Sequence, residues 1–419
     1  MNVTHINHAS ILIESNGYYI LTDPWVESHA FSGWRQQPAP SIKKIEEISK
    51  ISPSNLLVLC SHGHDDHFDD AAIKKYFNNN DIAIAKFKGP GVKFRAQRVT
   101  NGDVTEVDSD TFTWNGYKIK SYINADYTGD DAIFTIATEN NFVVHANDNW
   151  HEQPSEIIDK IKYDSSKYPS SKKAWLSQVG IAGSFPIYYG QYSHEEKTKI
   201  IKDAIDTMLL DGLKNAKKIE AKYHYIYANQ SMFINYVDYL KSYDRDIWIN
   251  DSINKAQEYN TEHIEQLFPG TVLFSKNKGI ATKNPSFNIK KFDSNNKDLA
   301  HFSNGKVEDD KLEEFSNQCN EYISSKLGQE GQFVGFYNNN SKRTISNKIS
   351  DNWDKDFNIL SEEGVWKKVY DGKINIECMT IGGLGTIYKK DKNKNYIDIH
   401  ILISNFGYGY QARKNKPKL

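Results

Sequence analysis

The run Ser61-His62-Gly63-His64-Asp65-Asp66-His67-Phe68-Asp69 carries the strongest signal in this chain. It directly follows the apolar residues 55–60, which predict a buried strand that leads into a polar loop. The chain has 13 histidines among 419 residues, and three of them fall here within six positions. We interpret the H-x-H-x-D-H pattern as a metal-binding loop, the alternative being a solvated loop rich in histidine and aspartate.

The spacing within this loop predicts two sets of metal ligands. His62 and His64 are two residues apart, so they point the same way where the chain is extended. Asp66 and His67 fall on the turn that opens a predicted helix at residues 69–77, whose acidic start suits a helix N-terminus. Imidazole and carboxylate ligands together are typical of zinc, iron or manganese rather than calcium. We therefore expect one or two divalent metal ions, with Asp66 also placed to accept a proton from a metal-bound water.

Composition narrows the class of protein. Lys and Arg number 52 against 54 Asp and Glu, a formal net charge of -2, which gives no reason to expect a nucleic acid or an anionic membrane as partner. Three scattered cysteines fit neither a disulfide framework nor a four-cysteine zinc site. No apolar run is long enough for a membrane span. We expect a soluble cytoplasmic protein with a small-molecule substrate, and the oligomeric state stays open.

The pattern of short apolar runs predicts an α+β fold in which two sheets are covered by helices. An Asn16-Gly17 turn joins two of the strands as a hairpin, and Ser193 with Glu196 predicts a capping box at a long helix. Strands are expected at residues 3–6, 9–14, 18–22, 56–60, 82–87, 103–107, 111–114, 117–123, 132–138 and 141–145, and helices at residues 41–49, 69–77, 152–160 and 195–215.

The amino-acid composition of the sequence changes after about residue 285. We predict a metal-binding domain over residues 1–285, a linker or surface loop over 286–310, and a C-terminal α+β domain or extension of unknown role over 311–419. The C-terminal part opens with an amphipathic helix that carries Leu312, Phe315, Cys319, Tyr322 and Ile323 on one face. Strands are expected at residues 332–337, 374–379, 386–389 and 396–403, and the basic end at residues 412–418 is expected to fray.

The loop and its surroundings resemble one branch of the metallo-β-lactamase fold, a four-layer αββα sandwich. The resemblance rests on His62 to His67, on Thr4-His5-Ile6-Asn7-His8-Ala9, on Ile20-Leu21-Thr22-Asp23-Pro24-Trp25 and on Ala30-Phe31-Ser32-Gly33-Trp34. This combination is similar to CMP-N-acetylneuraminate hydroxylases and, more loosely, to ascorbate-6-phosphate lactonases and N-acyl-phosphatidylethanolamine phospholipases D. It covers roughly residues 3–235 and leaves the C-terminal third unexplained.

The resemblance assigns further residues to the site. It makes Asp148 the carboxylate that bridges or completes the metal centre, with a turn-capping aspartate as the alternative. It gives Asp23 a hydrogen-bonding role behind the ligands, and His8 a place near the mouth of the site as a substrate contact or supporting residue. His145 is expected to be a strand residue that points elsewhere.

Two positions depart from the pattern of the fold. The fold usually supplies a third histidine some twenty residues before the aspartate, where this chain has Tyr127, with Asp126 as the nearest alternative ligand. The last histidine ligand is also uncertain, with His194 and His224 as candidates. His194 is equally well explained as a helix-opening surface residue, and His224 as part of an aromatic core strand.

These departures leave three functions in competition. A metal-dependent hydrolase of an ester, lactone, amide or phosphodiester is the first choice. If Asp126 is a ligand, two histidines and one carboxylate form the set that non-haem iron oxygenases use. Such an oxygenase needs electrons from a separate redox partner, because no cysteine here lies in a Rieske-type pair with histidine. A binding protein with a degenerate site is the third alternative.

Overall fold

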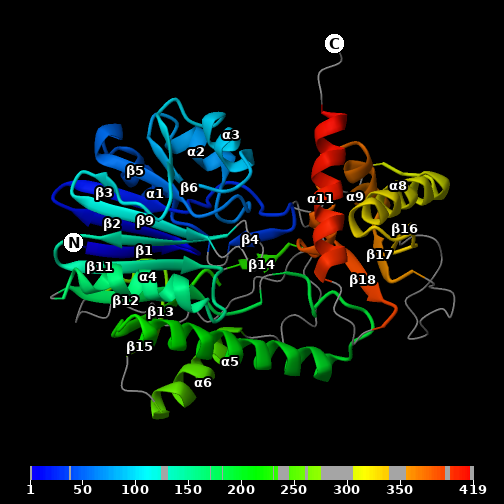
Figure 1. Ribbon diagram of the computed structural model, residues 1–419. Helices are drawn as coiled ribbons and strands as arrows, with labels where there is room; N and C mark the ends of the chain where they lie inside the picture. The colour runs from blue at the N-terminus through cyan, green and yellow to red at the C-terminus, as the bar shows by residue number, and fades with distance from the viewer. Residues whose placement is uncertain are drawn as a thin grey trace.

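The computed structural model describes residues 2–36, 39–123, 131–169, 171–181, 183–229, 231–234, 245–259, 263–274, 305–338, 355–391 and 397–415. Two facing sheets form the larger body (Figure 1), with helices α2 and α3 on one outer side and α5 and α6 on the other. A smaller body made of the C-terminal elements stands beside them.

The first sheet has the strand order β1-β2-β3-β5-β6-β7. Its first three strands pair antiparallel, and β3, β5, β6 and β7 run parallel. The elements are β1 (Asn2–Asn7), β2 (Ser10–Ser15), β3 (Tyr18–Thr22), β5 (Leu56–Cys60), β6 (Ile82–Ala85) and β7 (Val104–Val107), with α1 (Ile42–Ser49), α2 (Asp70–Tyr76) and α3 (Gly91–Gln97) on the outer face. Every residue of β5 is buried, as expected for a central parallel strand covered on both faces.

The second sheet has the strand order β15-β13-β12-β11-β10-β9-β8. Strands β11, β12, β13 and β15 are parallel, so their carboxyl ends meet at one edge. The elements are β8 (Phe112–Trp114), β9 (Tyr117–Ile123), β10 (Ala132–Ala137), β11 (Asn141–Asn147), β12 (Lys172–Gln178), β13 (Tyr223–Tyr227) and β15 (His263–Gln266), with α4 (Ser155–Ser166), α5 (His194–Lys218) and α6 (Arg245–Tyr259) against the outer face.

The main core lies between the two sheets. Ile11, Leu57 and Leu59 of the first sheet pack in one cluster with Phe134 and Leu176 of the second. All are fully buried. Since β5 ends in this core, the histidine loop that follows it starts from a fixed position.

Two predicted helix starts are confirmed. The Ser193 hydroxyl accepts a hydrogen bond from the Glu196 amide at 3.1 Å, and the Glu196 carboxylate accepts one from the Ser193 amide at 2.8 Å, which is the predicted capping box of α5. Asp69 caps α2 by accepting from the amides of Ala71 and Ala72.

The C-terminal elements have their own core. They are α8 (Asp309–Leu327), β16 (Val334–Asn338), β17 (Phe357–Ser361), α9 (Glu363–Tyr370), α10 (Glu377–Thr380), β18 (Gly385–Lys389) and α11 (Ile397–Lys414). The predicted amphipathic helix is α8, and it buries Leu312, Phe315, Cys319 and Ile323. The predicted domain boundary at residue 285 lies outside the described residues, as does most of the predicted linker.

Two predicted C-terminal strands are wrong. Residues 374–379 contain the short helix α10, and residues 396–403 belong to the long helix α11. Ile399, Ile403, Phe406 and Tyr410 enter the C-terminal core, and their spacing of three to four residues is helical. Of the basic end that was expected to fray, residues 412–414 are helical, and residues 416–418 lie outside the described residues.

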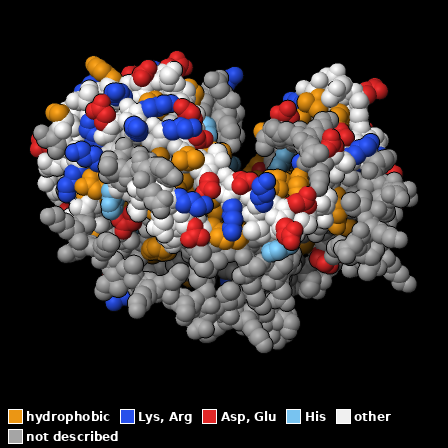
Figure 2. All heavy atoms as spheres, turned by 90° about the horizontal axis from the view of Figure 1, so that it is seen from below, with side chains coloured by type: hydrophobic (Ala, Val, Ile, Leu, Met, Phe, Trp, Pro, Cys, Tyr) orange, Lys and Arg blue, Asp and Glu red, His pale blue; other side chains and the backbone are white. Residues whose placement is uncertain are grey.

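The C-terminal body docks on the segment that follows β3. A Cβ atom added to Gly33 would lie 2.0 Å from the Gly382 carbonyl oxygen, so only glycine permits this backbone approach. The Trp34 indole donates a hydrogen bond to the Ile381 carbonyl at 3.0 Å. From below, the surface is hollowed between the two bodies (Figure 2).

Two small strands complete the described architecture. Strand β4 (Trp34–Gln36) pairs with β14 (Ser231–Phe233) in antiparallel fashion. Within the described residues, no helix has both the length and the apolar character needed to cross a membrane.

Candidate metal centre

Candidate metal ligands from four separate segments converge at the carboxyl end of β5. Within the described residues, three groups each place a nitrogen or oxygen atom of every member within 4.8 Å of the others. The groups are His62, His64 and Asp131; His62, His67 and Asp148; and His8, Asp66 and His67. Since His62 and His67 each belong to two groups, the three form one continuous cluster.

The first group combines two histidines with one carboxylate. His62 Nε2 lies 2.9 Å from His64 Nδ1 and 3.5 Å from Asp131 Oδ1. His62 is 1% exposed and Asp131 is 7% exposed. The site is therefore screened from bulk water on the side of β5 and β10.

Asp148 connects the first group to the rest of the cluster. One of its carboxylate oxygens lies 3.8 Å from His62 Nε2, and the other lies 3.3 Å from His67 Nε2. Asp148 directly follows β11, so the second sheet supplies this residue while the first sheet supplies the histidines. A carboxylate with one oxygen toward each histidine is placed to bridge two ions.

The third group contains His8, which lies in the turn between β1 and β2. Its Nε2 atom is 3.3 Å from Asp66 Oδ2, and that oxygen is 3.7 Å from His67 Nε2. The backbone of His8 has a φ of 45°, an uncommon conformation for a residue with a side chain. His8 thus lies among the candidate ligands themselves, closer than the mouth position that the resemblance implied.

A buried hydrogen-bond network holds the histidines from behind. Asp23 Oδ2 accepts from His67 Nδ1 and from His145 Nε2, each at 2.9 Å. Tyr227 in turn contacts His145 Nδ1 at 2.5 Å. The other Asp23 oxygen accepts from the Ser61 amide at 2.7 Å. The prediction that His145 points elsewhere is therefore wrong, because its ring lies in this network.

A second set of contacts fixes the loop from its outer side. The Arg95 guanidinium donates to Asp65 at 3.0 Å, to Asp70 at 2.6 Å and to the Phe68 carbonyl at 2.8 Å. Asp69 Oδ2 also accepts from the amides of residues 26, 27 and 28. The loop is therefore pre-organised by side chains that do not point at the cluster.

Charge and burial shift the protonation equilibria of the cluster. Burial, aided by His67 and His64, lowers the pKa of His62 well below its ordinary value. Burial also opposes a charge on His67, but the carboxylates of Asp148 and Asp66 outweigh it and raise the pKa of His67. Burial would likewise raise the pKa of Asp66, yet the neighbouring His67 and His8 lower it. His62 is therefore neutral and Asp66 anionic, which are the forms that bind metal, whereas His67 would release a proton on binding.

Several atoms of the cluster have no hydrogen-bond partner among the described residues. They are Asp66 Oδ1, His67 Nε2 and Asp148 Oδ1, all buried. Buried polar atoms are rarely left unsatisfied. Their lone pairs converge on the cluster, so the residues present fit a divalent metal ion.

Two predicted site residues cannot be placed. Asp126 and Tyr127 lie outside the described residues. The carboxylate grouped with His62 and His64 is that of Asp131, five positions after Asp126. The sequence interpretation missed Asp131. The available signal was its position directly before the predicted strand at residues 132–138, since ligands commonly lie at strand ends.

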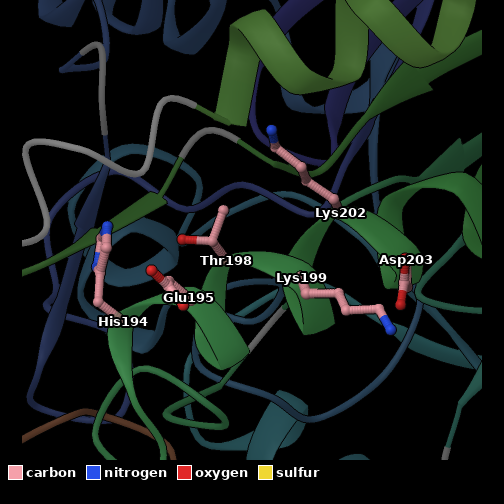
Figure 3. Close-up of a pocket in the computed structure, with 6 residues that line it drawn as sticks. All are labelled: His194, Glu195, Thr198, Lys199, Lys202 and Asp203. Atoms are coloured by element: carbon pink, nitrogen blue, oxygen red, sulfur yellow. The ribbon is translucent and has the colours of Figure 1, made fainter.

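The two candidates for the last histidine ligand lie away from the cluster. The exposed His194 opens α5 and, with Glu195, Thr198, Lys199, Lys202 and Asp203 of the same helix, lines an open surface depression (Figure 3). His224 is buried on β13, where its Nε2 lies 3.0 Å from the Ser177 hydroxyl. Neither residue belongs to the three groups.

Comparisons with known proteins agree with this architecture. Residues 2–173 match a family model described as a beta-lactamase superfamily domain. Over 84 residues the chain is 33% identical to a Mycolicibacterium smegmatis protein named for a Rieske 2Fe-2S iron–sulfur centre, covering 20% of this chain and 15% of that protein. Over 160 residues it is 28% identical to a metal-dependent hydrolase of Bacillus mycoides, covering 35% of this chain and 63% of that protein. The chain thus spans less than two thirds of either relative.

Among solved structures, the diiron β-hydroxylase CmlA of Streptomyces venezuelae aligns with a TM-score of 0.42 at 16% identity, covering 65% of this chain and 53% of that chain. The narrower resemblance to the sialic-acid hydroxylase branch stays a prediction. The two facing, helix-covered sheets, together with the family-model match over residues 2–173, show that this chain has the metallo-β-lactamase fold with additional C-terminal elements.

Proposed function

We propose that the protein is a metal-dependent hydrolase that acts on an ester, lactone, amide or phosphodiester. The observation that carries the proposal is the convergence of the three overlapping ligand groups on one buried cluster. His62, His64 and Asp131 would hold one divalent ion, and Asp66, His67 and His8 a second, with Asp148 between them.

The hydrogen bonds behind the histidines support this assignment. His67 Nδ1 is engaged by Asp23, and His62 Nδ1 lies 3.0 Å from the Ser61 hydroxyl. With the proton on Nδ1 in each ring, the Nε2 lone pair faces the cluster, the arrangement that carboxylate–histidine–metal contacts produce. The tautomers are inferred from these partners.

A divalent ion in such a site lowers the pKa of a bound water to about 7 and polarises a carbonyl or phosphoryl oxygen. The chain's own contribution is to orient and to move a proton. Asp66, held by His8 at 3.3 Å, is anionic at neutral pH because its pKa is lowered. It is therefore placed to accept a proton from the attacking water.

Asp131 favours a second candidate function, an iron-dependent oxygenase. Two histidines and one carboxylate are the set that non-haem iron oxygenases use. Such chemistry needs an external electron donor. Cys60, Cys319 and Cys378 are buried and free, so these cysteines do not supply the iron–sulfur centre of such a donor. The relative named for a Rieske centre is in keeping with a donor of that kind.

Metal analysis of protein purified in air separates these candidates. We expect one to two equivalents of zinc or manganese, together with hydrolysis of p-nitrophenyl esters or bis-p-nitrophenyl phosphate. Near-stoichiometric iron with an oxygen-sensitive optical band would replace the hydrolase with the oxygenase. Protein that retains no metal, even after incubation with zinc, iron or manganese, would leave a binding protein.

A further inference from the structure

Two buried asparagines beside the cluster have no hydrogen-bond partner, among the described residues, for either atom of their amide groups. They are Asn149 and Asn229, which are 1% and 6% exposed. An amide can donate two hydrogen bonds and accept two. Burying it without partners destabilises a fold, so each such group requires an explanation.

Two other buried asparagines, Asn320 and Asn80, have hydrogen-bond partners, whereas Asn7 and Asn338 each leave only one amide atom without a partner among the described residues. Asn320 in α8 donates to the Val334 carbonyl at 2.9 Å and accepts from the amides of Phe333 and Val334 at 2.8 Å. Asn80 donates to the Leu56 carbonyl at 2.9 Å. Asn149 and Asn229 differ from these residues because both atoms of each amide group lack a partner among the described residues.

That location is one edge of the second sheet. Asn149 lies two residues beyond the end of β11 and Asn229 two residues beyond the end of β13, with β12 between these strands. The three strands are parallel, with Asn147 opposite Ser177 and Gln178 opposite Tyr227, and the pairing of β11 with β12 shifts register between His145 and Asn147. The two amides therefore follow the carboxyl ends of their strands on either side of β12.

Both asparagines are attached to the metal cluster through the chain. Asn149 directly follows Asp148. Ala228, which precedes Asn229, donates its amide hydrogen to the His8 carbonyl at 3.0 Å. Each asparagine is thus one residue away from a candidate ligand or from the backbone partner of one.

A glycine stands between them where β12 ends. A Cβ atom added to Gly180 would lie 3.8 Å from the Asn229 Cβ and would meet no other heavy atom of the described residues within 4 Å. The φ of Gly180 is +138°, which residues with side chains rarely adopt. Within the part of the chain that the structure describes, the space beside Asn229 is therefore open at this point.

We propose that Asn149 and Asn229, on either side of Gly180, form a subsite for an uncharged carboxamide group of the substrate. A carboxamide pairs reciprocally with an asparagine side chain, because each group both donates and accepts. Neither asparagine brings a charge, so a carboxylate would lose hydration without gaining an ion pair. The inference rests on the proposed function and narrows its substrates to molecules that carry an amide near the bond that reacts.

The first test needs no ligand. Asn149→Leu and Asn229→Leu remove amides that stabilise nothing in the free protein, so we expect melting temperatures equal to or above that of the wild type. Asn320→Leu removes three hydrogen bonds and is expected to lower the melting temperature by several degrees. A drop in Asn149→Leu and Asn229→Leu that matches Asn320→Leu would assign these amides to the fold and overturn the subsite.

The second test measures binding. Acetamide is titrated into metal-free protein while the side-chain amide resonances of the asparagines are followed by NMR, with acetate as the charged control. We expect saturable shifts of the Asn149 and Asn229 resonances with acetamide only, and at least a tenfold weaker dissociation constant in Asn149→Ala and Asn229→Ala. Absent saturation in the wild type, equal response to acetate, or unchanged binding in both variants would each reject the proposal. Because the titration uses no metal, its outcome is independent of whether the cluster binds zinc.

Discussion

Asp23 Oδ2 lies 2.9 Å from both His67 Nδ1 and His145 Nε2, so one carboxylate oxygen joins a candidate metal ligand of the first sheet to a histidine of the second. Burial disfavours the charge on Asp23, but His145 and His67 outweigh burial and hold the pKa of Asp23 far below its usual range. Asp23 is therefore anionic at neutral pH although its side chain is fully buried.

This relationship predicts that His145 positions His67 without touching a metal. His145→Phe removes one hydrogen bond to Asp23, and we expect zinc affinity to fall about 10–100-fold. Competition titration with a chromogenic chelator at pH 7.5 measures this change.

His224→Gln is the matched control, since His224 is buried in the same sheet without contact to Asp23, and it is expected to retain wild-type affinity. Recovery of most of the affinity in His145→Gln, which can still donate to Asp23, would support a positioning role. Unchanged affinity in His145→Phe would contradict it.

The double variant His62→Ala with His64→Ala is expected to abolish metal binding and activity. Both rings belong to the first group, and His62 also belongs to the second. The C-terminal body should stay folded, because its core consists mostly of its own residues. Bound metal is measured by mass spectrometry and folding by the near-ultraviolet circular dichroism of the tryptophans. Retained stoichiometric metal in the double variant would remove these histidines from the site.

Substitutions of Asp131 and Asp126 are expected to affect metal stoichiometry differently. Because Asp131 lies 3.5 Å from His62 Nε2, Asp131→Ala should reduce the bound metal from two equivalents to one, or weaken the first ion at least tenfold. Asp126→Ala is the control and is expected to leave the stoichiometry unchanged. Titration calorimetry with zinc resolves the two sites. The reverse result would return the ligand role to Asp126.

His224 predicts a loss of stability in acid. Burial lowers its pKa from 6.5 to about 3, so the native state keeps the ring neutral while the unfolded chain takes up a proton below pH 6.5. Stability is therefore lost as the pH falls from about 6.5 toward 3, at about 1.4 kcal/mol per pH unit once the unfolded chain is protonated. Urea unfolding of metal-free protein at pH 7.5, 5.5 and 4.5 measures the loss. In His224→Gln the free energy of unfolding should fall less steeply with decreasing pH, by about 1.4 kcal/mol per pH unit. A decline identical to that of the wild type would refute the low pKa of His224.

Gly33 predicts a steric cost at the contact between the two bodies. Gly33→Ala places a methyl group 2.0 Å from the Gly382 carbonyl oxygen, and backbone cannot yield as a flexible side chain can. We expect a loss of about 3 kcal/mol in unfolding free energy, the upper range for overpacking. Gly89→Ala is the control, because its added Cβ meets no atom of the described residues within 4 Å. Equal stability of both variants would show that the backbones of Gly33 and Gly382 can move apart without loss of unfolding free energy.

The sequence predicted the parts of this molecule that depend on local pattern. The histidine loop, the buried strand before it and the Ser193 capping box need only neighbouring residues, and all three occur where expected. Asp131 was missed because its role depends on which acidic residue of this stretch of sequence meets His62 across the sheets, and spacing along the chain does not encode that choice.

The C-terminal strand at residues 396–403 failed for a different reason. Its isoleucines favour a strand by propensity, and the helical spacing of Ile399, Ile403 and Phe406 becomes decisive only when a core is present to bury it. His145 was misjudged because its partner Asp23 lies 122 positions away in the chain. Contacts between residues so far apart in the chain depend on how the strands are arranged in the two sheets.

The contact of Gly33 with Gly382 also links the thermodynamics of the two bodies. Phe31, two residues before Gly33, donates its amide to Asp65 at 3.4 Å, and its ring lies 5.7 Å from that of His64. Melting of the C-terminal body would release this segment and loosen the histidine loop. By linkage, an ion that binds only the ordered loop protects both bodies together. Calorimetry should then show a single cooperative transition that moves to higher temperature with zinc concentration. The C-terminal third, which contributes none of the candidate ligands, would then also be stabilised by the bound ion.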